Sequence, residues 1–410
     1  MSAEWTLHPL GELATFKYGK FLAKADLDPI GFPVFSGYGI VGYLPTYQFE
    51  RPQLVIVCRG EGGTGDVKMS PAKCSITNLS IVLTPDETKV AKGFLFWALR
   101  GSDTHRLRTG SAQAQIVIGS LKKLGVMAPR SMGEQIGIAA VLDSLDDRIA
   151  LLRETNATLE AIAQTLFKSW FVDFDPVRAK QQGLAPTGMD EATAALFPDG
   201  FEDSAMKAVP NAWSVGTLDD LADLNARTWS SRNHPERVLY LDLANVKDNE
   251  VAARVEFAFD EAPSRARRSL RSGDTIVGTV RPGNRSFAFI HEADLCLTAS
   301  TGFAVLSPKE VHNTAFVYLA ATQDTSIEHL AHVADGGAYP AVRPDVVSAL
   351  GCVVPPAAIL RAFNAVACPL LEKVAANRLQ AQTLATLRDT LLPRLISGQL
   401  RLPEAEALTD

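Results

Sequence analysis

The stretch LDSLDDRIALLRETNATLEAIAQTLFKSW, residues 142–170, decides how the chain is organised. From Glu134 to Asp175 there is a single glycine, Gly137, and no proline. Apolar residues recur at steps of three and four, with one polar residue, Asn156, on the same line. They are Leu142, Leu145, Ile149, Leu152, Leu159, Ala163, Leu166 and Trp170. This spacing is a heptad seam and predicts one long helix.

A second stretch near the end of the sequence repeats the pattern, with Asn377 and Arg388 as polar residues on its seam. Its apolar seam residues are Leu370, Val374, Ala381, Leu384 and Leu391. A helix of about 35 residues is roughly 50 Å long. Each helix either packs on its own domain or pairs with the other helix as an internal coiled coil. We favour the pair, because helices of globular proteins average only three or four turns.

The long helices belong to a larger repeat. Residues 110–129 align without a gap on residues 336–355, at an offset of 226 residues. Upstream, Trp5 parallels Trp213 at an offset of 208. This period is too long for a solenoid, whose repeats are about 20 to 50 residues. The chain is therefore predicted to contain two copies of one unit.

Runs of β-branched and aromatic residues, bounded by Gly, Pro and Asn, precede each long helix and predict strands. They occupy residues 53–58, 80–83, 275–280 and 302–306, and short helical stretches lie at 91–99 and 314–321. We predict an α+β fold with two similar domains and two long helices, related by pseudo-twofold symmetry. The expected bounds are 1–132 and 213–356 for the domains, 133–175 and 357–400 for the helices, 176–212 for a linker with one short helix at 190–196, and 401–410 for a tail.

Composition limits the class of protein. There is no apolar stretch of eighteen residues and no export signal, so we expect a soluble, cytoplasmic chain without a membrane partner. The five cysteines are scattered without a C-x-x-C pair, which indicates neither disulfides nor a zinc site. The net charge of −6 hides an uneven distribution, because residues 1–130 hold 15 Lys/Arg against 10 Asp/Glu. A basic face can therefore exist on an acidic chain.

Motifs for catalysis fail on their spacing. Residues 60–65 have the outer glycines of a phosphate loop, but Asp66 and Val67 follow where Lys and Ser/Thr are needed. Residues 85–89 hold the letters of a nuclease metal site, but its carboxylates are contiguous. No histidine spacing for a metal, no G-x-S-x-G elbow and no Asn-Pro-Pro-aromatic tetrapeptide occur. We therefore expect no catalysis by this chain and no metal site.

Polar loops that follow predicted strands are the candidates for recognition. Arg59 lies in a glycine-rich loop of the first copy, and Arg281 opens a polar loop of the second copy. Glycines let backbone N–H groups approach phosphate, and Arg and Asn can pair with guanine and adenine edges. Ordinary surface solvation is the alternative for any one of them. The predicted DNA-binding residues are Ser36, Tyr38, Arg59, Thr64, Lys68, Arg108, Ser111, Gln113 and Gln115 in the first copy, and Arg268, Arg281, Asn284, Arg285, Tyr339 and Arg343 in the second.

Two such readers on one chain would address two half-sites about 34 Å apart, which is one turn of DNA. Because the two copies differ in sequence, the two half-sites are expected to differ as well. A split, asymmetric DNA target follows.

Two motifs resemble one known family. Residues 170–176, WFVDFDP, resemble the central conserved region of type I restriction-modification specificity subunits. They follow the helix at 159–166 and precede Met189-Asp190 and residues 196–199, LFPD. Residues 391–398, LLPRLISG, resemble the distal conserved region of that family. The resemblance covers essentially the whole chain, whereas the domains ahead of the helices match the family only in their framework.

The resemblance implies two target recognition domains separated by two conserved helices that form an antiparallel coiled coil. It implies a non-catalytic subunit that reads double-stranded DNA for its partners. Those partners are two methyltransferase subunits, which methylate adenine with S-adenosylmethionine, and restriction subunits, which hydrolyse ATP and cut DNA. S-Adenosylmethionine, ATP and Mg would then be bound by the partners, so we expect no cofactor on this chain.

The aromatic residues Trp170, Phe171 and Phe174 form a group at the end of a predicted helix. We expect this group to bind a partner subunit or the opposite helix, and an ordinary core within the chain is the alternative. Two other functions stay open at this point. One is an orphan scaffold or decoy that binds methyltransferase subunits without reading DNA, and the other is a self-contained enzyme with an unrecognised site.

Overall fold

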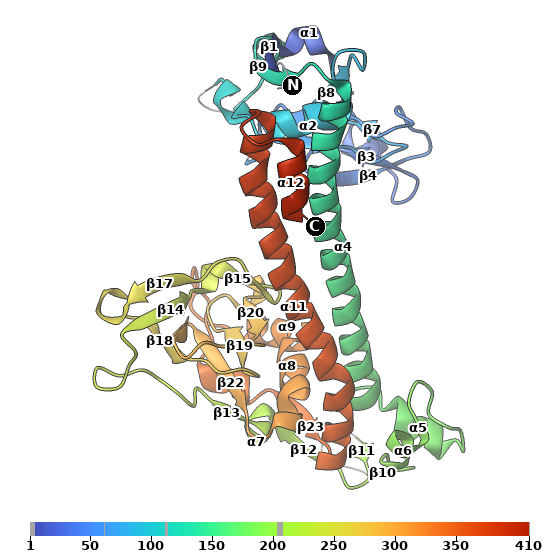
Figure 1. Cartoon of the computed structure of the whole chain (residues 1–410). Helices are drawn as coiled ribbons and strands as arrows, with labels where there is room; N and C mark the ends of the chain where they lie inside the picture. The colour runs from blue at the N-terminus through green and yellow to red at the C-terminus, as the bar shows by residue number, and fades with distance from the viewer. Residues whose placement is uncertain (1–4, 61, 111–113, 203–207, 410) are drawn as a thin grey trace. The chain divides into compact units, whose positions relative to one another are not determined.

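The chain divides into two compact units. The computed structural model describes residues 5–60, 62–110, 114–202 and 208–409. Unit 1 comprises Met1–Leu151 with Ala381–Asp410, and unit 2 comprises Leu152–Gln380. Both units combine helices with small sheets (Figure 1), which confirms the predicted α+β class.

Unit 1 carries its sheets ahead of the first long helix. Its elements are β1 (Trp5–Pro9), α1 (Leu10–Leu13), β2 (Ala14–Tyr18), η1 (Lys24–Asp26), β3 (Phe32–Phe35), β4 (Ile40–Leu44), β5 (Leu54–Val57), β6 (Val67–Met69), β7 (Ser75–Ile76), β8 (Ser80–Pro85), α2 (Lys92–Arg100), η2 (Thr104–Leu107), α3 (Ile118–Lys122) and β9 (Gly125–Pro129). The main sheet has the order β2-β8-β5-β6, a second has the order β4-β3-β7, and β1 pairs with β9. Strand β5 is buried along its whole length, as its apolar LVIV sequence predicts.

Unit 2 has a similar but longer set of elements. They are α5 (Asp175–Gln181), α6 (Glu191–Ala195), β10 (Phe201–Glu202), β11 (Val209–Pro210), β12 (Ser214–Thr217), α7 (Leu218–Leu221), β13 (Ala222–Leu224), β14 (Arg237–Leu241), η3 (Leu243–Asn245), β15 (Val246–Lys247), β16 (Glu250–Val251), β17 (Val255–Ala258), η4 (Phe259–Glu261), β18 (Ala266–Ser269), β19 (Thr275–Gly278), η5 (Pro282–Asn284), β20 (Phe287–Phe289), β21 (Leu297–Ser300), β22 (Phe303–Pro308), η6 (Val311–Asn313), α8 (Thr314–Thr322), α9 (Asp324–Val333), α10 (Pro344–Ser348) and β23 (Gly351–Val354). Its sheets have the orders β13-β22-β19-β20 and β17-β14-β21-β18, and β12 pairs with β23.

The two units repeat one topology, as the sequence offsets predict. Each main sheet has four strands in the same order, and each unit has an antiparallel pair of strands that are distant in sequence, β1 with β9 and β12 with β23. Equivalent hydrogen bonds recur, since Leu10 N donates to Leu124 O over 2.8 Å and Leu218 N donates to Leu350 O over 3.1 Å. The duplication is therefore a repetition of fold as well as of sequence.

The two predicted long helices are α4 (Met132–Phe171) and α11 (Ala357–Ile396). Within unit 2, Asn156 on α4 meets Asn377 on α11, and Trp170 on α4 meets Phe363 on α11. Later residues of one helix thus contact earlier residues of the other, which is an antiparallel pairing. The seam residues named from the sequence are all buried or half-buried.

The observed helix ends differ from the expected ones for local reasons. Helix α4 stops at Phe171 rather than at 175, because Phe174 adopts a left-handed backbone with φ of 58° and turns the chain. Helix α11 stops at Ile396 rather than at 400, two residues before Gly398, whose φ is 74°. A left-handed glycine just beyond a helix is a common terminator.

The two segments expected as a linker and a tail both contain helices. The expected linker, 176–212, contains α5 and α6, and it buries Val177 and Phe197 in the core of unit 2. The expected tail, 401–410, forms helix α12 (Leu402–Thr409), whose Ala405 is buried in the core of unit 1 beside α4 and α11 (Figure 1). The short helix expected at 190–196 is α6.

Each unit has its own main core. In unit 1 the sheet and α2 pack on the first half of α4 and the end of α11, through residues such as Trp97, Leu142 and Leu395. In unit 2 an aromatic cluster from α4, α8 and α11 forms the corresponding core. Among the described residues, no helix has the length and apolar content needed to cross a membrane.

Candidate nucleic-acid interface

In unit 1 the predicted recognition residues gather around the loop between β5 and β6. Tyr38 Oη donates a hydrogen bond to Arg59 O over 2.9 Å, and Arg59 lies over the ring of Tyr18. Gly60 has a φ of 114°, and a Cβ there would lie 2.4 Å from Tyr38 Oη. Glycine is therefore required at this position for Tyr38 to cross the loop.

The other side of this loop is held by the segment at 104–115. Arg108 Nε donates to Thr64 O over 2.6 Å, and Thr64 Oγ1 donates to Gly60 O over 2.9 Å. Gln115 pairs with both Arg59 and Thr109 through isolated β-bridges. Arg59, Arg108 and Gln115 are exposed, whereas Thr64 is buried. Thr64 consequently supports the loop and is not available to a ligand.

Ser36 is also buried, and its hydroxyl donates to Gly39 O over 3.1 Å within the turn that presents Tyr38. Lys68 is paired with Asp66 over 3.6 Å and lies 6.0 Å from the Tyr38 ring. The structure thus brings Ser36, Tyr38, Arg59, Thr64, Lys68, Arg108 and Gln115 into one cluster, called the unit 1 loop cluster below. Ser111 and Gln113 lie outside the described residues.

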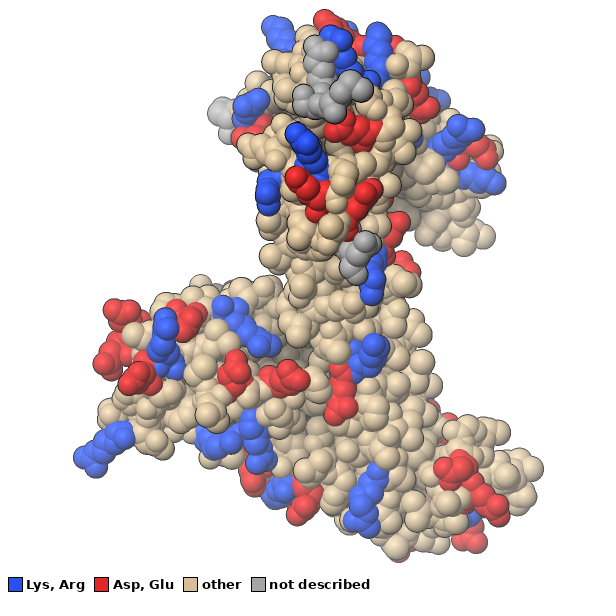
Figure 2. Space-filling view, viewed as in Figure 1, with Lys and Arg blue, Asp and Glu red and all other residues tan. Residues whose placement is uncertain are grey.

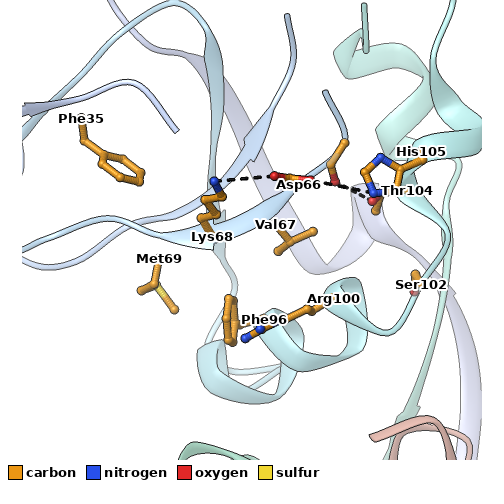
Figure 3. Close-up of a pocket in the computed structure, with 11 residues that line it drawn as sticks. Phe35, Asp66, Val67, Lys68, Met69, Phe96, Arg100, Ser102, Thr104 and His105 are labelled. Carbon is orange, nitrogen blue, oxygen red and sulfur yellow. Dashed lines mark hydrogen bonds and ion pairs between the residues drawn. The ribbon is translucent and has the colours of Figure 1, made fainter. Parts of the chain in front are cut away.

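A cavity of about 600 Å³ opens beside this cluster and includes residues that sequence reasoning missed. Asp66, Lys68 and His105 line this cavity (Figure 3). Asp66 is paired with Lys68, and its Oδ1 lies 3.8 Å from His105 Nε2. Arg100 lines the cavity from α2. Four basic residues between 100 and 108 were the available signal in the sequence.

In unit 2 the corresponding loop, Arg281–Arg285, follows β19. Its two arginines at the ends have left-handed backbones, with φ of 47° at Arg281 and 61° at Arg285. Such conformations are uncommon for residues with a Cβ and persist only where surrounding contacts enforce them. Val280 and Asp335 both pair with Ala341, as Arg59 and Thr109 pair with Gln115 in unit 1. The same framework therefore presents different side chains in the two units.

Arg281 and Tyr339 form one exposed group in unit 2. The guanidinium carbon of Arg281 lies 4.9 Å from the centre of the Tyr339 ring, and Arg281 Nη2 donates to Ala338 O over 2.7 Å. Tyr339 is 72% exposed. Asn284 is exposed in the same loop, and Arg343 begins α10 just beyond Ala341, where it pairs with Asp345 over 2.9 Å.

Arg285 is differently placed, although it belongs to the same loop. Its Nη1 donates to Asp324 over 2.7 Å, its Nε contacts Asp248, and its side chain is 33% exposed. The hydrogen bond with Asp248 raises the pKa of Arg285, and the bond with Asp324 acts in the same direction despite partial burial. Its charge is thus balanced by two carboxylates within the unit.

Arg268 lies in the other sheet of unit 2, on β18, and does not join the Arg281 loop. Its Nη1 donates to Thr228 Oγ1 over 3.0 Å, and burial lowers its pKa. Its neighbours Arg227 and Arg271 line a separate cavity of about 540 Å³. The predicted second reader is therefore split between two places.

The aromatic group Trp170, Phe171 and Phe174 lies in the core of unit 2, with exposures of 4%, 4% and 2%. Trp170 packs on Phe363 of α11 at 5.5 Å between ring centres, and Phe171 packs on Phe316 at 4.8 Å. All three side chains thus belong to an ordinary core within the chain, which was the alternative to binding a partner subunit or the opposite helix. Trp170 and Phe171 also contact Phe363 of the opposite helix, whereas Phe174 packs on Phe201 and Trp213.

Charge alone does not mark a binding face. On the face shown in Figure 2, Lys and Arg side chains alternate with Asp and Glu side chains. Among the described residues, no three His, Cys, Asp or Glu side chains meet in a group that could hold a metal ion. The exposed groups of the loops, by contrast, include hydrogen-bond donors and aromatic rings that a ligand can contact.

Comparisons with known proteins agree with this arrangement. The family model of the type I restriction modification DNA specificity domain matches residues 2–161. The type I restriction enzyme HindI specificity subunit of Haemophilus influenzae is 26% identical over 382 residues, covering 78% of this chain and 80% of that protein. The MjaIX specificity subunit of Methanocaldococcus jannaschii is 26% identical over 303 residues, covering 72% and 65%.

A solved structure has the same fold. The S subunit of a type I restriction-modification system from M. genitalium superimposes with a TM-score of 0.64 at 16% identity, covering 96% of each chain. Together these matches show that the chain carries the DNA specificity domain of type I restriction modification systems at residues 2–161, is similar over most of its length to type I restriction enzyme specificity subunits, and has the fold of a solved S subunit.

Proposed function

We propose that this chain reads a bipartite, asymmetric DNA target, one half with the unit 1 loop cluster and the other with the Arg281 loop. The observation that carries the proposal is the shared framework with unlike side chains. Tyr38, Arg59 and Arg108 are exposed in unit 1, whereas Arg281, Asn284 and Tyr339 are exposed in unit 2. Because base contacts decide sequence preference, unlike loops read unlike half-sites.

The chain itself supplies recognition and no bond-breaking step. We assign adenine methylation to two methyltransferase subunits that bind S-adenosylmethionine, and cleavage to restriction subunits that use ATP and Mg. This division is supported by the similarity of the chain to type I restriction enzyme specificity subunits.

Methylome sequencing tests this proposal. The full chain is expressed with a partner methyltransferase subunit in a host that lacks such a system. We expect methylated adenines in a motif of two short, different sequences separated by a gap of fixed length. The methyltransferase subunit expressed alone is the control and is expected to leave no motif. A single uninterrupted motif, or none with both subunits present, contradicts the proposal.

Salt dependence provides a second measurement on the same complex. A protein that neutralises phosphates loses affinity steeply as salt rises, with a slope of about −0.9 per phosphate contact in a double-logarithmic plot. We expect such a slope for duplex DNA. A scaffold that binds methyltransferase subunits without reading DNA has no specific DNA affinity to lose.

A further inference from the structure

The two arginines of the unit 2 loop have opposite surroundings. We propose that Arg281, held by Tyr339, reads a guanine in the half-site of unit 2, whereas Arg285 positions the loop and touches no base. This inference deepens the proposed function and rests on it. It also revises the sequence-based prediction, in which both arginines contact DNA.

Most of the guanidinium of Arg285 is occupied by contacts within unit 2. Its guanidinium bonds to Asp248 and Asp324, and it lies 5.3 Å from the ring of Phe287. A backbone hydrogen bond joins Arg285 to the same aspartate, since Asp248 N donates to Arg285 O over 2.8 Å. A phosphate or base would have to compete with two carboxylates for the guanidinium of Arg285.

The contacts of Arg285 continue to the long helices. Next to Asp248, Asn249 Nδ2 donates to Glu160 Oε1 of α4 over 2.8 Å. Glu160 also accepts a hydrogen bond from Arg378 of α11 over 2.7 Å. Asn249 Oδ1 accepts from Phe289 N over 2.8 Å, on the strand that follows the loop. Arg285 is thus one end of a polar chain that ties the loop to both helices within unit 2.

Arg281 is exposed and arranged for recognition. Tyr339 covers one face of its guanidinium, and Ala338 O takes one of its five N–H donors. Among the described residues, Arg281 is in no ion pair, so its charge and its remaining edge are available. The backbone holds it too, because Arg281 N donates to Pro340 O over 2.7 Å. Stacking and these bonds lower the entropy that a flexible arginine loses on binding.

The chemistry of a fixed guanidinium selects the base. Arginine has only donors, and guanine presents two acceptors, O6 and N7, side by side in the major groove. Adenine presents one acceptor and one donor there, which does not match the two parallel N–H groups of arginine. A phosphate also accepts from arginine, but a phosphate contact carries no preference among bases. Replacement of Arg281 by alanine therefore separates the two kinds of contact, because only the loss of a base contact changes the preferred sequence.

The test is selection from a duplex library of random sequence by the full chain in complex with its methyltransferase partner. We expect the Arg281→Ala variant to lose preference for a single guanine in one half-site, by roughly 5- to 150-fold. Tyr339→Leu should weaken preference at the same base and no other. The half-site of unit 1 serves as an internal control and should not change in any variant.

Arg285 is tested by rescue. Arg285→Ala should weaken the whole half-site evenly without changing the ranking of bases, and Arg285→Lys should restore part of that affinity. The exchange of charges in Arg285→Asp with Asp248→Arg should recover more affinity than either single change. A melting temperature for each variant shows that the complex is folded when its preference is measured.

The outcomes separate this inference from the proposed function. If the unchanged complex selects no motif, both fail. If it selects a two-part motif whose guanine preference Arg281→Ala leaves intact, only the role of Arg281 is overturned. If Arg285→Lys removes the preference for one base, Arg285 is a reader and the division of roles is wrong.

Discussion

Asp274 is a carboxylate with no exposed surface at the base of β19, the strand that leads to the Arg281 loop. It accepts from Arg271 N over 2.8 Å, and Arg271 Nε and Arg227 Nη2 lie 3.4 Å and 3.7 Å from its oxygens. Burial raises its pKa from the ordinary 3.8, and these partners offset that rise only in part. The group is therefore harder to ionise in the folded chain than in the unfolded chain.

This shift has a definite sign for stability. Between the unfolded and the folded pKa, the folded chain binds more protons, so stability falls as pH rises through that interval and stays lower above it. We expect the free energy of unfolding of Asp274→Asn, taken relative to that of the unchanged chain, to be higher at about pH 7 than at about pH 4. Each unit by which the folded pKa exceeds the unfolded pKa corresponds to about 1.4 kcal/mol of stability. Urea titrations at the two pH values measure it.

The control is Asp294→Asn, which removes an exposed carboxylate from the cavity lined by Arg227 and Arg271 and is measured at the same two pH values. An Asp274→Asn difference that is independent of pH contradicts the role given to burial.

The sequence predicts residue types at this scale better than residue roles. Arg281 and Arg285 are indistinguishable as two arginines of one polar loop. Their difference comes from Asp248 and Asp324, which lie 37 and 39 residues from Arg285 along the chain. Buried Ser36 and Thr64 were misjudged for the same reason, because their exposure depends on segments that pack over them.

Among the elements, the two long helices each carry polar groups on an otherwise apolar seam. In unit 2, Asn377 Nδ2 donates to Asn156 Oδ1 over 2.9 Å, and Asn156 Nδ2 donates to Val374 O over 3.1 Å. In unit 1, Arg388 is 13% exposed and pairs with Asp146 of α4 and with Asp389. Buried polar pairs of this kind favour one register, because a shifted register leaves them without partners.

A double-mutant cycle tests the asparagine pair. We expect Asn156→Leu alone to lower the free energy of unfolding by about 1–3 kcal/mol, since it leaves the Asn377 amide buried without its acceptor. Asn156→Leu with Asn377→Leu should cost clearly less than the sum of the single changes, because no orphan remains. Urea unfolding followed by circular dichroism measures all four proteins.

Glu154→Ala is the matched control, since Glu154 lies on the same helix with an exposed side chain. It should change the free energy of unfolding by no more than about 0.5 kcal/mol. Additive losses for the two asparagines would mean that they do not act as a pair.

For the whole molecule, the two ends of each recognition domain pair as antiparallel strands. Trp5 pairs with Pro129 in unit 1, and Ser214 pairs with Val354 in unit 2. A domain whose ends are adjacent can be replaced without moving the segments that flank it. Phe316 packs on Phe167 and Phe171 of α4, and Asn249 bonds to Glu160 of the same helix, so a replacement for the second domain has to keep these contacts.

This geometry predicts independent exchange of half-sites. Replacement of residues 213–356 by the equivalent segment of a relative should change one half of the methylated motif and preserve the other. The reciprocal replacement of residues 5–129 should change the opposite half. Methylome sequencing of both hybrids provides the measurement, and a hybrid that alters both halves, or neither, excludes independent reading.

The sequence by itself determined the two copies, the strands before each long helix and the seams of the helices. These features depend on local periodicity and on a fixed offset along the chain, which a linear reading detects. Only the tertiary structure decided that the expected linker and tail are folded, that the aromatic group at 170–174 belongs to the core of unit 2, and which arginine of the recognition loop is paired. Burial and ion pairing depend on neighbours that are distant in sequence, and those neighbours are known only when the chain has folded.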